Sequence, residues 1–217
     1  MQLRDPPPPQ QPTQAVSQIT PNLYIGTLSS STSIPLLLTN HITALVSLTH
    51  SPFEEWSRPA NRKIIPAKNH LYVQCDDSPD QDILCRLEEI CDFIDNHSAP
   101  ATKSKVDAIL AKLGDGTELK KGVSIEEEEI HGGGKVLVHC YEGVSRSGAI
   151  VVAYLMRKEK KSLKETLRFV RRKRRVVQPS RNFMQQLKVW ERDGCKVWKE
   201  DGKPRDGYRK WLENKEK

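Results

Sequence analysis

The sequence lacks the long apolar run that a membrane-spanning helix needs. Such a helix takes roughly 20 consecutive apolar residues, and no window of the 217-residue chain approaches that length. The opening stretch, MQLRDPPPPQQPTQ, contains no apolar segment of the kind found in secretory signals. We therefore expect no membrane span and a location in the cytoplasm, the nucleus or both.

The sequence also lacks paired cysteines. None of its five cysteines has the spacing of a disulfide framework or of a zinc site, and its histidines are scattered. We expect reduced thiols, no metal site and no other cofactor. The cysteines are Cys75, Cys85, Cys91, Cys140 and Cys195.

Apolar residues are scarce, and positive charge is in excess. Hydrophobic residues make up 36% of the chain, and the mean hydropathy is −0.62, which indicates one modest core with polar appendages. The net charge is +7 and the pI is about 9.1. The excess is concentrated between Arg157 and Arg175 and favours acidic partners, such as phosphorylated ligands, nucleic acid or anionic lipid.

Composition divides the chain into one compact domain and polar segments. Residues 1–17 are rich in Pro and Gln and are predicted to be a disordered tail. Residues 18–192 form the domain, interrupted by an insertion at about 98–134 that is either a lid-like element or a flexible excursion. A short helix is expected at 106–113 and a solvated acidic run at 126–129. Residues 193–217 are a charged extension that no pattern places.

The apolar pattern predicts alternating strands and helices. Short β-branched runs predict strands at 23–25, 42–48, 70–75 and 135–139. Apolar residues at helical spacing predict helices that begin near residues 83, 163 and 183. The continuous apolar run at 149–156 predicts a buried helix. This alternation is typical of an α/β fold with a central, mostly parallel sheet flanked by helices.

The stretch KVLVHCYEGVSRSGAIVVAYLM, residues 135–156, places Cys140 at the end of a predicted strand and Arg146 at the start of a helix. Backbone N–H groups and the positive end of a helix bind anions at such a turn. Gly143 lets the backbone approach the ligand closely, and the guanidinium of Arg146 suits two phosphate oxygens. Cysteine thiols in such surroundings are readily ionised, so Cys140 is the candidate nucleophile toward phosphorus.

These residues resemble a known signature. HCYEGVSRSG is similar to the His-Cys-(five residues)-Arg-Ser/Thr motif of protein tyrosine phosphatases, and the AYLM at 153–156 resembles the dual-specificity subfamily. PNLYIG and ITALVSL resemble the opening strands of that family. PSRNFMQQL resembles its later Pro-Asn-x-x-Phe-x-x-Gln-Leu element, with Ser180 where Asn is usual. The resemblance covers roughly residues 19–190 apart from the insertion, and it implies the same α/β fold.

The resemblance also implies roles. Ser147 would hydrogen-bond to the sulfur, His139 would support the loop, and Glu142 would order Arg146 by pairing. Residues 141–146 would hold the phosphate. They are Tyr141, Glu142, Gly143, Val144, Ser145 and Arg146.

The family's general acid is an Asp on the loop after a strand. Asp76 and Asp77 both lie there, but the family usually has Asp or Asn, then Ile or Leu, five residues beyond the acid. Asp82-Ile83 has that spacing from Asp77. Asp77 is therefore the candidate acid, with a turn-forming role as its alternative, and Asp82 is expected to cap a helix.

We expect a phosphatase that acts on phosphotyrosine, and on phosphoserine and phosphothreonine, through a cysteinyl-phosphate. Its partner is a phosphorylated protein, with no obligatory nucleic acid; the oligomeric state stays open. One alternative is a phosphatase for phosphoinositides or RNA 5′ phosphates, although the loop has none of the lysines typical of phosphoinositide members. Another is a phospho-binding module without turnover.

Three further features have competing interpretations. The basic run at 171–175 is expected to be an exposed helix face rather than a nuclear localisation signal. Cys75 is expected to be buried and inert rather than a disulfide partner of Cys140. The PPPP segment is expected to be passive rather than an SH3 or WW ligand. No kinase-docking domain is expected upstream, since only the short tail precedes the domain.

Overall fold

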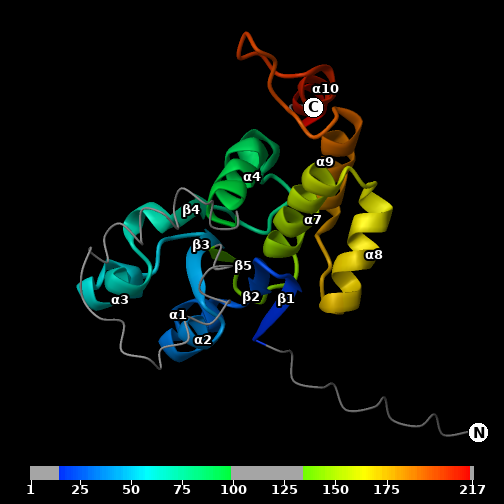
Figure 1. Ribbon diagram of the computed structural model, residues 1–217. Helices are drawn as coiled ribbons and strands as arrows, with labels where there is room; N and C mark the ends of the chain where they lie inside the picture. The colour runs from blue at the N-terminus through cyan, green and yellow to red at the C-terminus, as the bar shows by residue number, and fades with distance from the viewer. Residues whose placement is uncertain (1–14, 99–133, 216–217) are drawn as a thin grey trace, which may run out of the picture.

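A computed structural model describes residues 15–98 and 134–215 of the chain (Figure 1). The predicted helix at 106–113, the acidic run at 126–129 and the PPPP segment lie outside the described residues. Within the described ranges, the expected α/β architecture is confirmed: a five-stranded sheet is flanked by helices.

The sheet has the strand order β1-β2-β5-β3-β4. β2, β5, β3 and β4 run parallel, and β1 pairs with β2 in the antiparallel sense. All four predicted strands are present, and β1 is additional. The strands are β1 Val16–Thr20, β2 Leu23–Gly26, β3 Ile42–Thr49, β4 His70–Gln74 and β5 Lys135–His139.

The start of β1 corrects the predicted boundary of the N-terminal tail. Val16 and Ser17 fall within the range 1–17, but they are paired with Gly26 and Ile25 of β2. The polar residues Ser17 and Gln18 interrupt the apolar pattern, which hid this strand. Its hydrogen bonds to β2 hold it in place.

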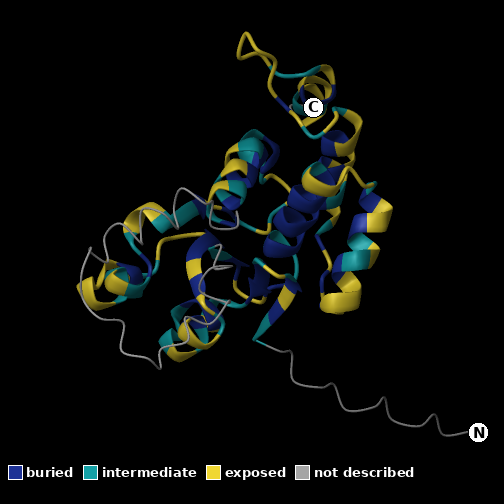
Figure 2. Ribbon diagram, in the orientation of Figure 1, coloured by how far each residue is buried: buried dark blue, intermediate teal, exposed yellow. Residues whose placement is uncertain are grey.

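Helices cover both faces of the sheet (Figures 1 and 2). One face carries α4 Leu84–Ser98, α7 Arg146–Glu159, α8 Leu163–Lys173 and α9 Arg181–Arg192. The other carries the short helices α1 Leu28–Thr32, α2 Ile34–Thr39 and α3 Pro59–Ile64, with the 3₁₀ turns Glu54–Ser57 and Ala67–Asn69. Because β3 and β5 are buried on both faces, their sequences are almost continuously apolar.

Side chains of β5 alternate between two cores. Val136 and Val138 face the larger core with α7, whereas Leu137 packs with Leu37 and Trp56 in the smaller one. The helix α7 is buried from Ser147 to Met156 (Figure 2). This burial fixes the segment that follows β5 between the sheet and its neighbouring helices.

The charged extension after residue 192 packs on the domain. It contains α10, Asp206–Lys215, which lies against α9. Val197 and Tyr208 are buried in the larger core. Charge dominates this segment, so its few buried side chains gave no readable periodicity. None of the helices in the described ranges is long and apolar enough to cross a membrane.

Candidate active site

The predicted phosphate loop lies at the carboxyl end of the central strand β5, between β5 and α7. Gly143 in this loop has φ 67°, a left-handed conformation that favours glycine. A Cβ atom there would lie 2.6 Å from the backbone oxygen of Gly26 and 2.8 Å from a guanidinium nitrogen of Arg174. The loop can therefore take this shape only with glycine at position 143.

Cys140 is buried beneath this loop, 2% exposed. Its Sγ accepts a hydrogen bond from the backbone N–H of Gly143 at 3.2 Å and lies 3.2 Å from Oγ of Ser147. Ser147 is in the first turn of α7, where the helix dipole is positive. A thiolate at Cys140 would accept both hydrogen bonds, and Ser147 lies where the sequence predicted it.

Arg146 is the first residue of α7, and its guanidinium reaches into the loop region. Nη1 donates to the carbonyl of Cys75 at 3.1 Å, and the guanidinium carbon lies 4.9 Å from the centre of the Tyr141 ring. Its Nε–H is buried and has no acceptor within the described ranges. A buried, unpaired donor is costly unless a ligand accepts from it, which fits a phosphate oxygen at this place.

The expected pairing of Glu142 with Arg146 is wrong. Glu142 is exposed and forms no ion pair with Arg146 in the described part of the chain. The left-handed turn at Gly143 separates the two side chains, and Tyr141 contacts the guanidinium instead. Val144 accepts a backbone hydrogen bond from Gln178 at 3.1 Å, so its part in the loop is structural.

Arg174 was missed as a site residue. It belongs to the run at 171–175 predicted to be an exposed helix face, but it is only 4% exposed. Its Nε donates to the carbonyl of Gly143 at 2.8 Å and its Nη2 to the carbonyl of Glu142 at 3.2 Å. α8 ends at Lys173, so Arg174 turns inward as the C-cap. It thereby holds the backbone of the phosphate loop, which no charge pattern could indicate.

The structure separates the two acid candidates. Asp77 accepts a hydrogen bond from Oγ of Ser145, in the phosphate loop, at 3.0 Å. Asp76 instead pairs with Nδ1 of His50 at 3.0 Å. Asp77 is exposed at the rim of the loop. Of the two carboxylates, only Asp77 is hydrogen-bonded to the phosphate loop.

The segment from Asp76 to Asp82, called the acid loop below, is fastened by α9. The side-chain amide of Asn182 donates to the carbonyls of Ser78 and Gln81 at 3.0 and 2.8 Å. Gln186 is fully buried, and its amide oxygen accepts from the N–H groups of Ile83 and Leu84. Ser180, the departure from the family pattern, still caps α9. The element therefore holds the acid loop through Asn182 and Gln186.

The C-terminal extension fastens the acid loop from its other end. Tyr208 donates to Oδ2 of Asp82 at 2.7 Å, and Lys215 donates to the carbonyl of Asp80. Burial raises the pKa of Tyr208, so it remains a donor at neutral pH. Asp82 also accepts from the N–H of Cys85 at 3.4 Å, at the start of α4. Asp82 therefore has the predicted capping role and also binds Tyr208, a contact that the sequence did not indicate.

His139, predicted to support the loop, ends a chain of hydrogen bonds. Arg62 has only donors, so Nδ1 of His70 accepts from it at 3.1 Å. Nε2 of His70 then donates to Oγ of Ser47 at 2.7 Å, and Ser47 donates to Nε2 of His139 at 2.6 Å. The remaining proton of His139, on Nδ1, faces the carbonyl of Cys140 at 3.5 Å. The chain therefore fixes one neutral tautomer of His139.

Burial lowers the pKa of His139 to about 3 and that of His70 to about 4. As pH falls below the unfolded value of about 6.5, the unfolded chain takes up protons before the folded chain does. Stability is therefore lost on acidification, between pH 6.5 and the folded values. For His139 the loss at pH 5 is about 2 kcal/mol. We expect thermal or urea unfolding to show a weaker pH dependence in His139→Gln than in the wild type.

The control for this comparison is His41→Asn. His41 is exposed and left-handed, a conformation that asparagine tolerates. Its variant should retain the full pH dependence. An unchanged pH dependence in His139→Gln would show that the buried histidine is not the titrating group.

Cys75 is buried, and burial raises its pKa to about 12. It is therefore a protonated thiol at neutral pH and a poor partner in disulfide exchange. Its carbonyl accepts from Arg146. These observations favour the prediction that the Cys75 thiol is inert. Cys75 contributes to the site through its backbone carbonyl.

Comparison with known proteins agrees with this geometry. The family model described as "Dual specificity phosphatase, catalytic domain" matches residues 117–193. The chain is 30% identical over 183 residues to "Dual specificity protein phosphatase MPK-4" of Drosophila melanogaster, covering 84% of this chain and 38% of that protein. It is 32% identical over 174 residues to "Dual specificity protein phosphatase 5" of Rattus norvegicus, covering 80% of this chain and 35% of that protein.

A crystal structure of DUSP15 has the same fold, with a TM-score of 0.60 and 22% identity, covering 92% of this chain and 95% of that one. The chain thus contains a domain of the dual-specificity phosphatase type, within the protein tyrosine phosphatase superfamily. It spans little more than a third of the length of the two curated relatives named above.

Proposed function

We propose that the protein hydrolyses phosphate monoesters of phosphorylated proteins through a cysteinyl-phosphate intermediate. One observation carries this proposal: Sγ of Cys140 accepts from the N–H of Gly143 beneath a loop where the Nε–H of Arg146 is buried without an acceptor. A candidate nucleophile and a buried donor suited to a phosphate oxygen thus lie at the same loop. This arrangement suits phosphoryl transfer, which depends mostly on positioning and electrostatic stabilisation.

In the first step, Sγ of Cys140 attacks phosphorus and the bond to the leaving oxygen breaks. Arg146 and the loop N–H groups hold the phosphate oxygens, on which charge develops. Asp77, in its protonated form, gives its proton to the leaving oxygen. Its hydrogen bond to Ser145 places this carboxyl beside the loop. The products are the free alcohol or phenol and a phosphorus–sulfur bond.

In the second step, water attacks phosphorus and the phosphorus–sulfur bond breaks. The Asp77 carboxylate takes a proton from the water, and inorganic phosphate is released. Ser147, 3.2 Å from the sulfur, donates to the thiolate as it leaves. Asp77 therefore acts as acid in the first step and base in the second, while Cys140 is first the nucleophile and then the leaving group.

The rim of the loop favours an aromatic phosphate ester as one substrate. Tyr141 is 41% exposed, and its ring packs edge-on against Phe53 at 6.2 Å. Together they form an apolar wall beside Arg146, suited to a phosphotyrosine ring. Phosphoserine and phosphothreonine are proposed as additional substrates, as in the chain's family.

The test is release of phosphate from a panel, in reductant, between pH 5 and 8. The panel contains p-nitrophenyl phosphate, phosphotyrosine and phosphothreonine peptides, phosphoinositides and RNA 5′-triphosphate. Turnover of the aryl phosphate and the peptides is expected. If phosphoinositide or RNA is hydrolysed faster than the phosphopeptides, the proposed protein substrate is wrong and the non-protein alternative holds. Binding of phosphopeptide without turnover would make the protein a phospho-binding module.

The acid role of Asp77 predicts an effect that depends on the leaving group. A poor leaving group, such as the phenol of phenyl phosphate, needs the proton, whereas an acidic phenol departs without it. For Asp77→Asn we expect kcat on phenyl phosphate to fall roughly 10²-fold, with a much smaller loss on a fluorogenic ester of an acidic phenol. Asp76→Asn, whose side chain faces His50, is the matched control and should behave like the wild type.

The tether from the extension predicts a weaker effect with the same signature. Tyr208→Phe removes the hydroxyl bound to Asp82 and frees one end of the acid loop. We expect kcat on phenyl phosphate to fall roughly 3- to 10-fold, the scale of one ordinary hydrogen bond, while the ester of the acidic phenol is hydrolysed normally. Arg209→Gln is the matched control, because it removes only surface ion pairs with Asp206 and Glu213 on the same helix. Equal losses on both substrates would contradict a role in positioning the acid.

A further inference from the structure

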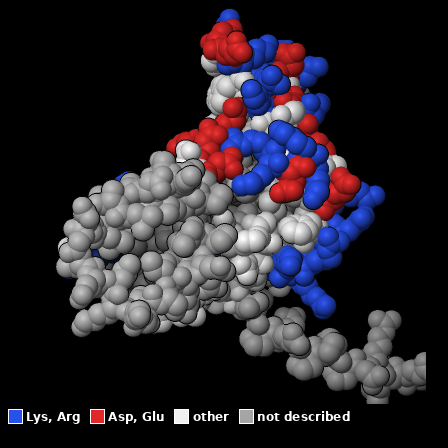
Figure 3. Space-filling view, in the orientation of Figure 1, with Lys and Arg blue, Asp and Glu red and all other residues white. Residues whose placement is uncertain are grey.

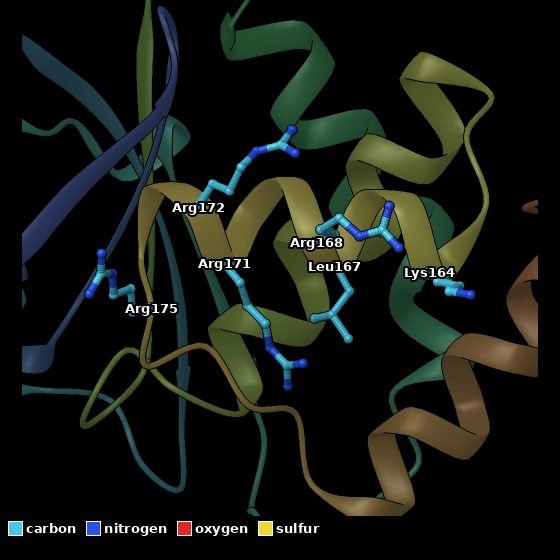
Figure 4. Close-up of a pocket in the computed structure, with 6 residues that line it drawn as sticks. All are labelled: Lys164, Leu167, Arg168, Arg171, Arg172 and Arg175. Carbon is cyan, nitrogen blue, oxygen red and sulfur yellow. The ribbon is translucent and has the colours of Figure 1, made fainter.

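A basic hollow lies along α8, outside the catalytic loop (Figure 4). We call it the α8 groove; its volume is about 520 Å³. Five of its six lining side chains are basic, and Leu167 provides apolar surface among them. Lys and Arg side chains gather over this helix in the space-filling view (Figure 3). The lining residues are Lys164, Leu167, Arg168, Arg171, Arg172 and Arg175.

These basic side chains are not neutralised by the surrounding protein. Some cations elsewhere in the described ranges are paired, as Arg157 is with Asp92 and Asp95. None of the five basic groups lining the α8 groove forms an ion pair with a described acid. Glu165, the acid on the same helix, is engaged by Ser162 in a capping box. The groove therefore presents uncompensated positive charge to solvent.

One hydrogen bond and one cation–π contact hold part of this surface in shape. Nε of Arg171 donates to the carbonyl of Val177 at 2.8 Å, and the guanidinium of Arg172 lies 5.8 Å from the centre of the Phe169 ring. Side chains already held in place lose less conformational freedom when they bind a ligand. The groove is thus better prepared for an anion than a row of unrestrained lysines.

The α8 groove is connected to the catalytic loop. Arg175 follows Arg174, which binds the carbonyls of Glu142 and Gly143. Three residues later, the N–H of Gln178 donates to Val144 in that loop at 3.1 Å. Three extended residues span at most about 10 Å, so one end of the groove lies near the loop. The 11-residue helix α8 is about 16 Å long, the length of about five extended residues.

We propose that the α8 groove binds an acidic stretch of the phosphoprotein substrate while its phosphorylated residue occupies the catalytic loop. This inference rests on the proposed phosphatase function. Carboxylates would meet the guanidinium groups, and Leu167 would contact an apolar side chain between them. The lining contains no aromatic side chain on which a nucleic-acid base could stack. A peptide therefore suits the groove better than RNA.

The experiment compares two phosphotyrosine peptides that differ only in a cluster of Asp and Glu, or of Ser and Gln, four to eight residues from the phosphotyrosine. Peptides with the cluster on either side are used. The variant is Arg168→Glu with Arg172→Glu, both exposed and outside the catalytic machinery. Lys63→Glu with Lys68→Glu changes the net charge equally elsewhere on the surface.

For the wild type we expect a roughly 10-fold higher kcat/KM on one acidic peptide, through KM, decreasing with added salt. The Arg168/Arg172 double variant should lose this preference and still hydrolyse p-nitrophenyl phosphate normally, while the Lys63/Lys68 control keeps it. No preference in the wild type, or an unchanged one in the double variant, overturns the proposal. The proposal is also overturned if the Arg168/Arg172 double variant loses binding to RNA but keeps its preference for the acidic peptide.

Failure of the phosphatase function would appear separately, as wild-type protein that hydrolyses none of these substrates. The α8 groove is then tested by fluorescence anisotropy with the unphosphorylated acidic peptide. Binding to the wild type that is lost in the Arg168/Arg172 double variant supports the groove. Absence of binding to the wild type overturns it.

Discussion

Replacing Cys140 by serine is expected to lower turnover of p-nitrophenyl phosphate by roughly 10⁴-fold or more, as loss of a covalent nucleophile does elsewhere. A serine hydroxyl is a far weaker nucleophile than a thiolate at neutral pH. The hydroxyl fits the site, because Sγ of Cys140 already exchanges hydrogen bonds with Gly143 and Ser147. The variant should therefore fold and still bind phosphate.

Two measurements separate loss of chemistry from loss of structure in Cys140→Ser. Its thermal unfolding should match that of the wild type, and a labelled phosphotyrosine peptide should still bind, since Arg146 and the loop N–H groups remain. Cys91→Ser is an informative comparison, because Cys91 is a buried thiol on α4 outside the site. Full activity in Cys140→Ser would remove the cysteinyl-phosphate mechanism.

The second large effect is expected at Arg146. Arg146→Lys keeps the positive charge but loses the planar fork and the buried Nε–H that has no acceptor in the described protein. Since the guanidinium would stabilise charge developing on the phosphate oxygens, we expect kcat to fall roughly 10³-fold. Phosphopeptide binding should weaken much less, because lysine still attracts the phosphate.

Arg86→Lys provides the matched control for Arg146→Lys. Arg86 lies on α4 and pairs with Glu89 on the surface, so its replacement should leave kcat unchanged. If Arg146→Lys raises KM and leaves kcat unchanged, the arginine binds the ground state and the transition state equally well. The proposed role in the transition state would then be wrong.

Much of the sheet could be predicted because its strands carry strong patterns. β3 and β5 are buried on both faces, and their β-branched runs are hard to mistake. The short helices α1, α2 and α3 were not predicted, because each has only five or six residues and no complete apolar stripe. In such elements the tertiary contacts decide the conformation.

Some residues of the candidate site could likewise be predicted from the sequence, and others could not. Cys140, Arg146 and Ser147 lie close together in sequence; the strand–turn–helix pattern indicated the first two, and the family resemblance added Ser147. Asp77 required the family pattern to choose it over Asp76, and the hydrogen bond to Ser145 supports that choice. Arg174 was hidden in a run of similar charges, because only the end of α8 turns it inward.

Tyr208 escaped prediction for another reason: its partner Asp82 lies 126 positions away along the chain. Contacts of this range have no local signature in a single sequence. The consequence is that α10, in a segment that composition set apart from the domain, contacts the loop that carries the candidate acid.

The bond between Tyr208 and Asp82 also implies a reciprocal coupling. If docking of α10 favours the catalytic position of the acid loop, then any ligand that holds the acid loop in that position must favour docking of α10 by the same factor. Occupancy of the phosphate loop is then communicated to α10, whose Tyr208 and Lys215 contact the acid loop. A protein that binds α10 would then have a different affinity when a ligand occupies the phosphate loop. By the same factor, its binding would change the affinity of the phosphate loop for that ligand.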